Sequence, residues 1–294
     1  MIYGGGPQSP LDESPVVVLP IPYGATLTYR AGAADGPAAL LAASAQMELF
    51  DDELGEEIIQ AGIHTAPTVE PNLASPEAMM ATIRQAALPH LQAGRFLAAI
   101  GGDHSITVGL LQAFCDHFGT GFSVLQLDAH ADLRESYHGT PLSHACVMHN
   151  VAGMGLPFVQ VGIRSLSEPE WNLIRQRGWG DRIFWARDIV PAAQRQDEAW
   201  MARVVEQLAP LVYVTLDLDA LDPAIMPAVG TPEPGGLDYY TVLRLLRRVT
   251  RERRVVGFDI NELSPLPGQP AGEFMASRIL YKMIGYVKSS APPD

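Results

Sequence analysis

The segment LVYVTLDLDALDP, residues 211–223, joins an apolar run directly to closely spaced aspartates. Three other segments share this layout: LAAIGGDHS (97–105), SVLQLDAHAD (123–132) and VVGFDINELSP (255–265). The apolar runs are typical of strands that are buried on both faces of a parallel sheet. In an open α/β sheet, the loops after the strands meet at the carboxyl edge, where ligands bind. The polar residues expected at this edge are Asp103, His104, Asp128, His130, Asp132, Asp217, Asp219, Asp259 and Glu262.

The rest of the chain alternates short apolar runs with longer amphipathic segments. Strands are expected at 16–19, 58–63, 96–100, 122–127, 159–163, 183–186, 211–216 and 255–260. Helices are expected at 36–44, 76–91, 106–118, 144–151, 169–177, 197–208, 239–250 and 272–284. This alternation predicts an α/β fold with a parallel sheet that is covered by helices on both faces. Because no repeat or long linker divides the chain, we predict one domain over 1–294, with loose termini at 1–10 and 289–294.

The composition limits the classes of partner. Hydrophobic residues make up 47% of the 294 residues and charged residues 18%, which is typical of a globular protein. A net charge of −13 disfavours binding to nucleic acid and anionic membranes and favours small cationic ligands. Cys115 and Cys146 lie in apolar surroundings, which predicts reduced thiols in a cytosol. No secretory signal or membrane span is visible, so we expect a cytoplasmic protein.

The acidic residues after the strands need a counter-charge. Carboxylates a few ångströms apart raise each other's pKa, and a pair of divalent cations would neutralise them. Carboxylates with imidazoles, and no thiolate in the motifs, favour an ion such as Mn²⁺. The spacing of Asp128 and His130, like that of Asp217 and Asp219, points two ligands to the same side of a strand end. A single aspartate there could instead form a turn, as we expect for Asp222 before proline, but several motifs together favour a metal centre.

Five segments resemble those of one enzyme family. GGDHS (101–105), DAHAD (128–132) and TLDLDALDPAIMPAVGTPEPGG (215–236) resemble the signature motifs of the ureohydrolases, which include arginase, agmatinase, guanidinobutyrase and formimidoylglutamase. PIPYGATLTYRAGAADGPAAL (20–40) resembles their N-terminal strand and substrate-side loop, and DINELSP (259–265) their late acidic motif. The resemblance covers almost the whole chain and is closest to agmatinases. It implies an arginase-like, three-layer α-β-α fold with a parallel sheet of about eight strands, assembled as a homo-oligomeric trimer or hexamer.

The resemblance also implies two Mn²⁺ ions per subunit. One ion would be held by His104, Asp128, Asp132 and Asp217, and the second by Asp128, His130, Asp217 and Asp219. Asp128 and Asp217 would bridge the two ions. The implied reaction is attack of a bridging hydroxide on the guanidinium carbon of agmatine, which gives putrescine and urea in polyamine biosynthesis.

Three residues are expected to act on the substrate or its protons. Asp132 would accept a hydrogen bond from the hydroxide and carry its proton. Glu262 would pair with the guanidinium NH groups, because a charge-assisted contact orients this planar cation. His144, in a Ser-His-Ala pattern that resembles agmatinases, is the preferred proton shuttle and a second substrate contact. His138, in a His-Gly-x-Pro pattern that resembles arginases, is the alternative shuttle.

The substrate is expected to be a small cationic guanidino compound, with agmatine first. The segment LRESY (133–137) departs from the polar set with which arginases bind an amino acid. Arg134 could clamp a carboxylate, as in guanidinobutyrate, or pair with Glu135 or a neighbouring subunit. LPGQPAGEF (266–274) also departs from the family pattern.

Other readings of the sequence remain open beside agmatinase. They are guanidinobutyrase, arginase, formimidoylglutamase and a non-catalytic arginase-like binding subunit. A metal-dependent phosphoesterase is disfavoured, because no basic residue lies in the ligand motifs to hold a phosphate.

Overall fold

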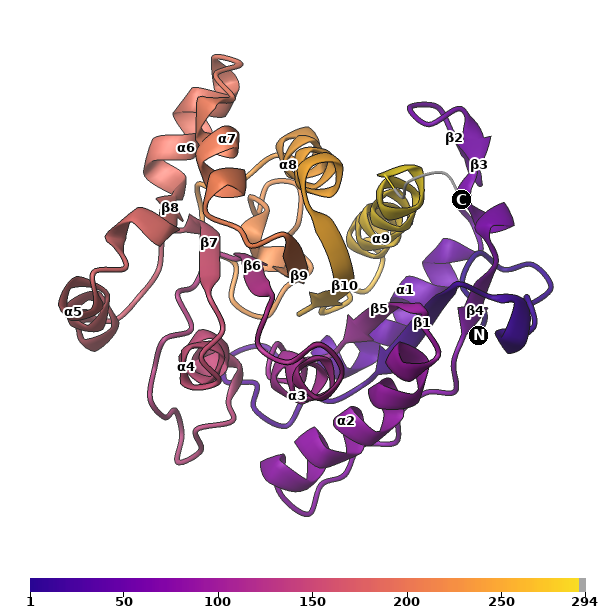
Figure 1. Ribbon diagram of the computed structural model, residues 1–294, viewed down its shortest axis with the longest axis horizontal. Helices are drawn as coiled ribbons and strands as arrows, with labels where there is room; N and C mark the ends of the chain where they lie inside the picture. Colours follow the sequence, from indigo (N-terminus) through magenta and orange to yellow (C-terminus); the bar gives the residue numbers. More distant parts are fainter. Residues whose placement is uncertain (291–294) are drawn as a thin grey trace.

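The computed structural model describes residues 1–290, which surround a parallel sheet of eight strands (Figure 1). Its spatial order is β4 (Ile63–Thr65), β1 (Val16–Ile21), β5 (Phe96–Gly101), β10 (Arg254–Asn261), β9 (Leu211–Asp217), β6 (Ser123–Leu127), β7 (Phe158–Ile163) and β8 (Ile183–Trp185). Every neighbouring pair in the sheet is parallel. The predicted fold class is therefore confirmed. A short antiparallel pair, β2 (Phe50–Asp51) and β3 (Glu56–Glu57), lies outside this sheet.

Helices cover both faces of the sheet (Figure 1). One apolar core holds side chains from α1 (Gly36–Ser44), α6 (Ala186–Gln194), α7 (Ala199–Glu206), α8 (Tyr239–Glu252) and α9 (Ala271–Ser290). The opposite core holds side chains from α2 (Pro76–Gln92), α3 (Ile106–Phe118), α4 (Val147–Gly153) and α5 (Glu168–Arg177). Alternate residues of β1 belong to opposite cores, Val16 and Val18 to the first and Val17 and Leu19 to the second. This two-sided burial explains why the strands read as continuous apolar runs.

Local signals set several helix boundaries where they were expected. The side chain of Ser75 accepts a hydrogen bond from the N–H of Ala78, and Pro76 occupies the first position of α2. Ser167 and Glu170 form a capping box at the start of α5, which ends at the left-handed residue Gly178.

Two sequence predictions about secondary structure were wrong. The strand predicted at 58–63 is a 3₁₀ turn, Ile58–Ala61, followed by β4, because the left-handed Gly62 separates the two. Helix α6, which contains Pro191, was not predicted. Its buried residue Ile189 belongs to the apolar core on that side of the sheet.

Within 1–10, the segment expected to be loose, Tyr3 is buried and anchored. Its hydroxyl donates to the carbonyl of Ser277, and its backbone N–H donates to the hydroxyl of Thr65 at 2.9 Å. At the other end, 289–290 belong to α9, and 291–294 lie outside the described residues.

Both cysteines are free thiols in the structure. Cys146 is buried, as expected, whereas Cys115 is only half-buried. Among residues 1–290, no helix is long and apolar enough to cross a membrane.

Candidate metal centre

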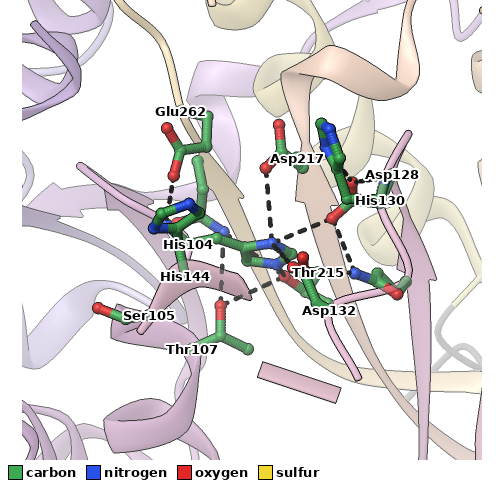
Figure 2. A network of polar contacts seen from close by, with 12 residues as sticks. His104, Ser105, Thr107, Asp128, His130, Asp132, His144, Thr215, Asp217 and Glu262 are labelled. Carbon is green, nitrogen blue, oxygen red and sulfur yellow. Dashed lines mark hydrogen bonds and ion pairs between the residues drawn. The ribbon is translucent and has the colours of Figure 1, made fainter. Parts of the chain in front are cut away.

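The four acidic motifs lie at the carboxyl ends of four adjacent strands, β5, β10, β9 and β6, in the middle of the sheet. These strands are far apart in the sequence, and the parallel crossovers bring their ends to one edge. Figure 2 shows the resulting polar network, in which carboxylates from several strands surround His104. The predicted convergence at one sheet edge is therefore present.

A first cluster surrounds one ring nitrogen of His104. Its Nδ1 atom lies 3.1 Å from Asp128 Oδ2, 3.1 Å from Asp132 Oδ2 and 3.5 Å from Asp217 Oδ2. All four side chains are buried. Within residues 1–290, this Nδ1 atom makes no hydrogen bond, although it is shielded from solvent.

The other ring nitrogen explains how His104 is held. Its Nε2 atom lies 2.8 Å from the hydroxyl oxygen of Thr215, which itself donates to Asp259 Oδ1 at 2.6 Å. Because the Thr215 hydrogen is used on Asp259, Nε2 must carry the hydrogen that the Thr215 oxygen accepts. Nδ1 then faces the carboxylates, and it is the nitrogen that would offer its lone pair to a metal ion. A buried lone pair among acidic oxygens fits a metal ligand, and the Thr215 contact is the kind that orients such ligands.

A second cluster forms around His130, which is half-buried. Its Nδ1 atom lies 2.9 Å from Asp219 Oδ2 and 3.6 Å from Asp128 Oδ1. The backbone N–H of Ala129 donates to Asp219 Oδ1 at 3.0 Å and holds that carboxylate in place. Asp128 thus has one oxygen in each cluster, as a bridging ligand requires.

Asp217 completes the set of six predicted ligands at this edge. Its Oδ2 atom faces His104, and its Oδ1 atom accepts the N–H of Asp219 at 2.9 Å. Two groups of ligand atoms lie close enough together to hold one ion each. The first comes from His104, Asp128 and Asp132, and the second from Asp128, His130 and Asp219. Asp217 lies beside the first group and falls outside both, so its bridging position remains a prediction.

The electrostatics of the cluster favour added positive charge. Burial, together with the charge of Asp128, raises the pKa of Asp132 to about 7. Burial and the charges of Asp219 and Asp128 raise the pKa of Asp217 well above its usual value. In the part of the chain that the structure describes, no lysine or arginine pairs with these carboxylates. Divalent cations would supply the missing charge.

Two buried glutamines that the sequence analysis missed support the proposed ligands through hydrogen bonds. Gln126, inside β6, donates to Asp128 Oδ2 at 2.7 Å. Gln160, inside β7, donates to the side-chain oxygen of Gln126 and to the carbonyl of Ala131. The available signal was a glutamine within an otherwise apolar strand, because a buried amide needs partners.

Arg164 was also missed, and it carried no distinguishing signal in the sequence. Its guanidinium donates to the backbone carbonyls of Asp219 and Glu233, both at 2.7 Å. It thereby ties the loop that contains Glu233 to the turn that carries Asp219.

Glu262 lies beside the first cluster and is buried. Its Oε1 atom accepts the backbone N–H of His104 at 2.8 Å. Burial, and then the charge of Asp103, raises the pKa of Glu262 well above its usual value. Glu262 and Asp132 have φ values of 67° and 52°, in the left-handed region that such residues rarely occupy. Strained backbone of this kind tends to occur at functional sites.

The two candidate shuttle histidines differ in position. His144 is half-buried and contacts Thr26, which in turn contacts Asp103, the neighbour of His104 (Figure 2 includes His144 in the network). His138 is exposed and stacks edge-on against Tyr137, with ring centroids 4.4 Å apart. The structure therefore brings His144 to the cluster and leaves His138 at the surface.

The pairing considered for Arg134 with Glu135 is absent. Arg134 instead lies 3.8 Å from Glu170 and over the ring of Tyr137, whereas Glu135 is exposed. Glu170 is buried and caps α5, so this contact joins the loop after Asp132 to that helix.

Comparison with known proteins agrees with this geometry. The model of the arginase family matches residues 14–285. The chain belongs to the arginase family. Members of this family hydrolyse C–N bonds of amidino groups, so the predicted enzyme class is confirmed.

Relatives and solved structures place the chain among agmatinase-like members. It is 44% identical over 281 residues to the N(1)-aminopropylagmatine ureohydrolase of Thermus thermophilus, covering 96% of this chain and 93% of that protein. It is 29% identical over 280 residues to the agmatinase of Pyrococcus horikoshii, covering 95% and 94%. The crystal structure of the agmatine ureohydrolase of Thermoplasma volcanium superposes with a TM-score of 0.84 at 29% identity, covering 95% and 92%.

Proposed function

We propose that the chain is a two-manganese ureohydrolase that removes urea from the guanidino end of agmatine-type polyamines. N(1)-aminopropylagmatine is the first substrate and agmatine the second. Identity to the named N(1)-aminopropylagmatine ureohydrolase is 44%, whereas identity to the named agmatinase is 29%. The substrate order thus differs from the sequence prediction, which placed agmatine first, while the guanidino group that reacts is the same.

The observation that carries the proposal is the sign of the charges at the site. Six carboxylates, those of Asp103, Asp128, Asp132, Asp217, Asp219 and Glu262, are buried at one sheet edge. None of them pairs with a lysine or arginine within residues 1–290. Such a site accepts metal cations and a cationic substrate and rejects phosphate esters, which require basic clamps.

The proposed metal ligands are His104, Asp128, His130, Asp132, Asp217 and Asp219. The unbonded Nδ1 atom of His104 and the shared carboxylate of Asp128 support this assignment. Bound Mn²⁺ ions would make a nearby water acidic enough to attack at neutral pH.

The remaining chemistry is assigned to three side chains. Asp132 would accept a hydrogen bond from the attacking water and take one of its protons. Glu262 would bind the guanidinium NH groups and orient the central carbon for attack. His144 would deliver a proton to the leaving amine.

The carboxylate of Glu233, beside His130, supports a substrate that carries amines beyond its guanidino end. Glu233 is half-buried, and its Oε1 atom lies 3.9 Å from Nε2 of His130, too far for a hydrogen bond. Its backbone is held by Arg164, so the carboxylate is presented from a fixed loop. An ammonium group beyond the guanidino end would be attracted to it.

A substrate panel tests the proposal. Purified protein loaded with Mn²⁺ is assayed for urea release from N(1)-aminopropylagmatine, agmatine, arginine and guanidinobutyrate. We expect kcat/KM to be highest for N(1)-aminopropylagmatine and at least tenfold lower for arginine, about 1.4 kcal/mol of transition-state discrimination. A preference for arginine or guanidinobutyrate would show that the substrate assignment is wrong. Two bound Mn²⁺ ions without urea release from any of the four would indicate a non-catalytic member.

The assembly and location of the protein stay predictions. We expect a trimer or hexamer, which light scattering would measure, and a cytoplasmic enzyme, which fractionation of the source cells would locate.

A further inference from the structure

Thr26 links His144 to a buried carboxylate. The hydroxyl oxygen of Thr26 accepts the backbone N–H of His144 at 3.0 Å and lies 3.2 Å from His144 Nδ1. The same hydroxyl lies 3.1 Å from Asp103 Oδ2, and the backbone N–H of Thr26 donates to that oxygen at 2.9 Å. Three loops, which follow β1, β5 and β6, therefore meet at one threonine oxygen.

Asp103 is well suited to polarise this hydroxyl. Its side chain is fully buried, and no lysine or arginine pairs with it within the described chain. Its Oδ1 atom is occupied by the N–H and hydroxyl of Ser105, which leaves Oδ2 for Thr26. The carboxylate is thus held in one orientation from both sides.

This arrangement decides where the proton of His144 lies. The Thr26 hydroxyl has one hydrogen, and a carboxylate is a stronger acceptor than a neutral imidazole nitrogen. Thr26 then donates to Asp103, and its oxygen accepts from Nδ1–H of His144. Ser143 Oγ lies 3.4 Å from the same Nδ1 atom, a longer contact than the 3.2 Å to Thr26, so the Thr26 oxygen is the main partner of Nδ1–H and Nε2 stays unprotonated in the neutral ring.

The geometry points to Thr26 and Asp103 as positioning residues that fix the tautomer and ring orientation of His144, so that Nε2 is the nitrogen that exchanges protons. The inference rests on the proposed function, because it assumes that His144 moves a proton. Neither residue contacts the reacting atoms in this role. A buried acid that orients a catalytic imidazole through a hydrogen bond follows the same physical logic as the acid of a hydrolase triad.

The proton balance of the step is simple. The attacking water releases two protons as its oxygen becomes that of urea: Asp132 accepts one and Nε2 of His144 the other, so the ring becomes a cation with a hydrogen on both nitrogens. When the C–N bond breaks, its electron pair stays on the amine nitrogen, which receives both protons and leaves as an ammonium. The Nδ1 hydrogen remains on the ring throughout.

Thr26→Val and Thr26→Ser are the matched pair that tests the inference. Valine has the shape of threonine without the hydroxyl, whereas serine keeps the hydroxyl. We expect Thr26→Val to lower kcat about tenfold with less than a twofold change in KM, since positioning acts on the chemical step. Thr26→Ser should stay within about twofold of the wild type. Added imidazole should restore part of the Thr26→Val loss, because it can carry the proton in place of a misoriented ring.

The decisive measurement is Thr26→Val in the His144→Asn background. If Thr26 acts through His144, the second substitution should change kcat by less than about twofold there, because residues that act as a unit are not additive. An equal tenfold loss in both backgrounds, or a Thr26→Ser enzyme as slow as Thr26→Val, would overturn the inference. Loss of bound Mn²⁺ or of thermal stability in Thr26→Val would also overturn it and indicate a structural role. Thr26→Ala replaces Thr26→Val if the latter is insoluble.

The proposed function fails in a different way. Absence of urea release by the wild type from every guanidino compound would sink both proposals. Normal activity of His144→Asn, with an active wild type, would leave the ureohydrolase assignment intact and overturn the positioning role alone.

Discussion

His104 and His144 are held by the same device in two different regions of the molecule. Asp259 and Thr215 orient His104, and Asp103 and Thr26 orient His144. The His104 chain is fully buried, and its Thr215 and Asp259 are register partners on the adjacent strands β9 and β10. The His144 chain is made by loops, and its histidine is only half-buried.

The difference between the two regions matches different tasks. A metal ligand must hold one position in a dry site, and hydroxyls and carboxylates on paired strands supply that rigidity. A proton carrier must exchange with solvent or with the leaving group, and a partly exposed loop allows this. If the proposed roles hold, the same Asp–Thr–His chain serves a metal ligand when strands carry it and a proton carrier when loops carry it. Four substitutions test this comparison.

The largest effect is expected for His104→Asn. It removes the buried ring nitrogen that faces three carboxylates, so the ion on that side should be lost. Elemental analysis should find at most one Mn²⁺ per chain, and urea release should fall by more than about 10³, since metal activation of water carries the reaction. His130→Asn, which changes the half-buried histidine of the second cluster, is the matched control. An active His104→Asn enzyme with two ions would show that the buried cluster is not a metal site.

The next effect is expected for Glu262→Gln. The amide keeps the shape and can still accept the N–H of His104, but it removes the charge that would pair with the guanidinium. A lost charge-assisted pair in a desolvated site costs several kcal/mol, so kcat/KM should fall several hundredfold. Metal content should stay at two ions. Loss of metal in this variant would place Glu262 in the metal shell and refute its substrate role.

The effect of His144→Asn should be about a hundredfold on kcat, with little change in KM. Burial lowers the pKa of His144 below its usual value, so the ring is neutral at pH 7.5 and able to accept a proton. As the pH falls through this pKa, the ring becomes protonated and kcat of the wild type should fall. In His144→Asn this fall of kcat at low pH should disappear, and added imidazole should restore activity. His138→Asn is the control, and a rescuable defect there instead would reverse the assignment.

The smallest effect is expected for Thr215→Val. The substitution removes the acceptor for Nε2–H of His104 and leaves all proposed ligands in place. Loss of such an orienting contact lowers metal affinity about tenfold, and excess Mn²⁺ should restore full kcat. If Thr215→Val binds Mn²⁺ as tightly as the wild type, the contact of Thr215 with His104 adds nothing to metal affinity. A kcat defect that excess Mn²⁺ cannot correct would instead assign Thr215 a role in the chemical step.

The sequence by itself predicted the sheet and the chemistry of its carboxyl edge. Motifs such as DAHAD, residues 128–132, are local, and the spacing of Asp128 and His130 alone indicates two ligands that face one side. Apolar runs that end in aspartate or histidine likewise indicate strand ends, because a parallel strand that is covered on both faces has apolar residues at consecutive positions. The arginase-like fold and the family followed from these local patterns.

Only the tertiary structure decided which residues hydrogen-bond to the proposed metal ligands and hold them in place. Thr215 reaches His104 because β9 and β5 meet β10 on its two sides, and no local pattern records which side chain a crossover brings to a given nitrogen. The structure likewise places His144, and not His138, in contact with Thr26, which favours His144 as the proposed proton carrier. Tautomers, orientation and access to solvent depend on contacts between segments that lie far apart in the sequence, and these contacts exist only in the folded chain.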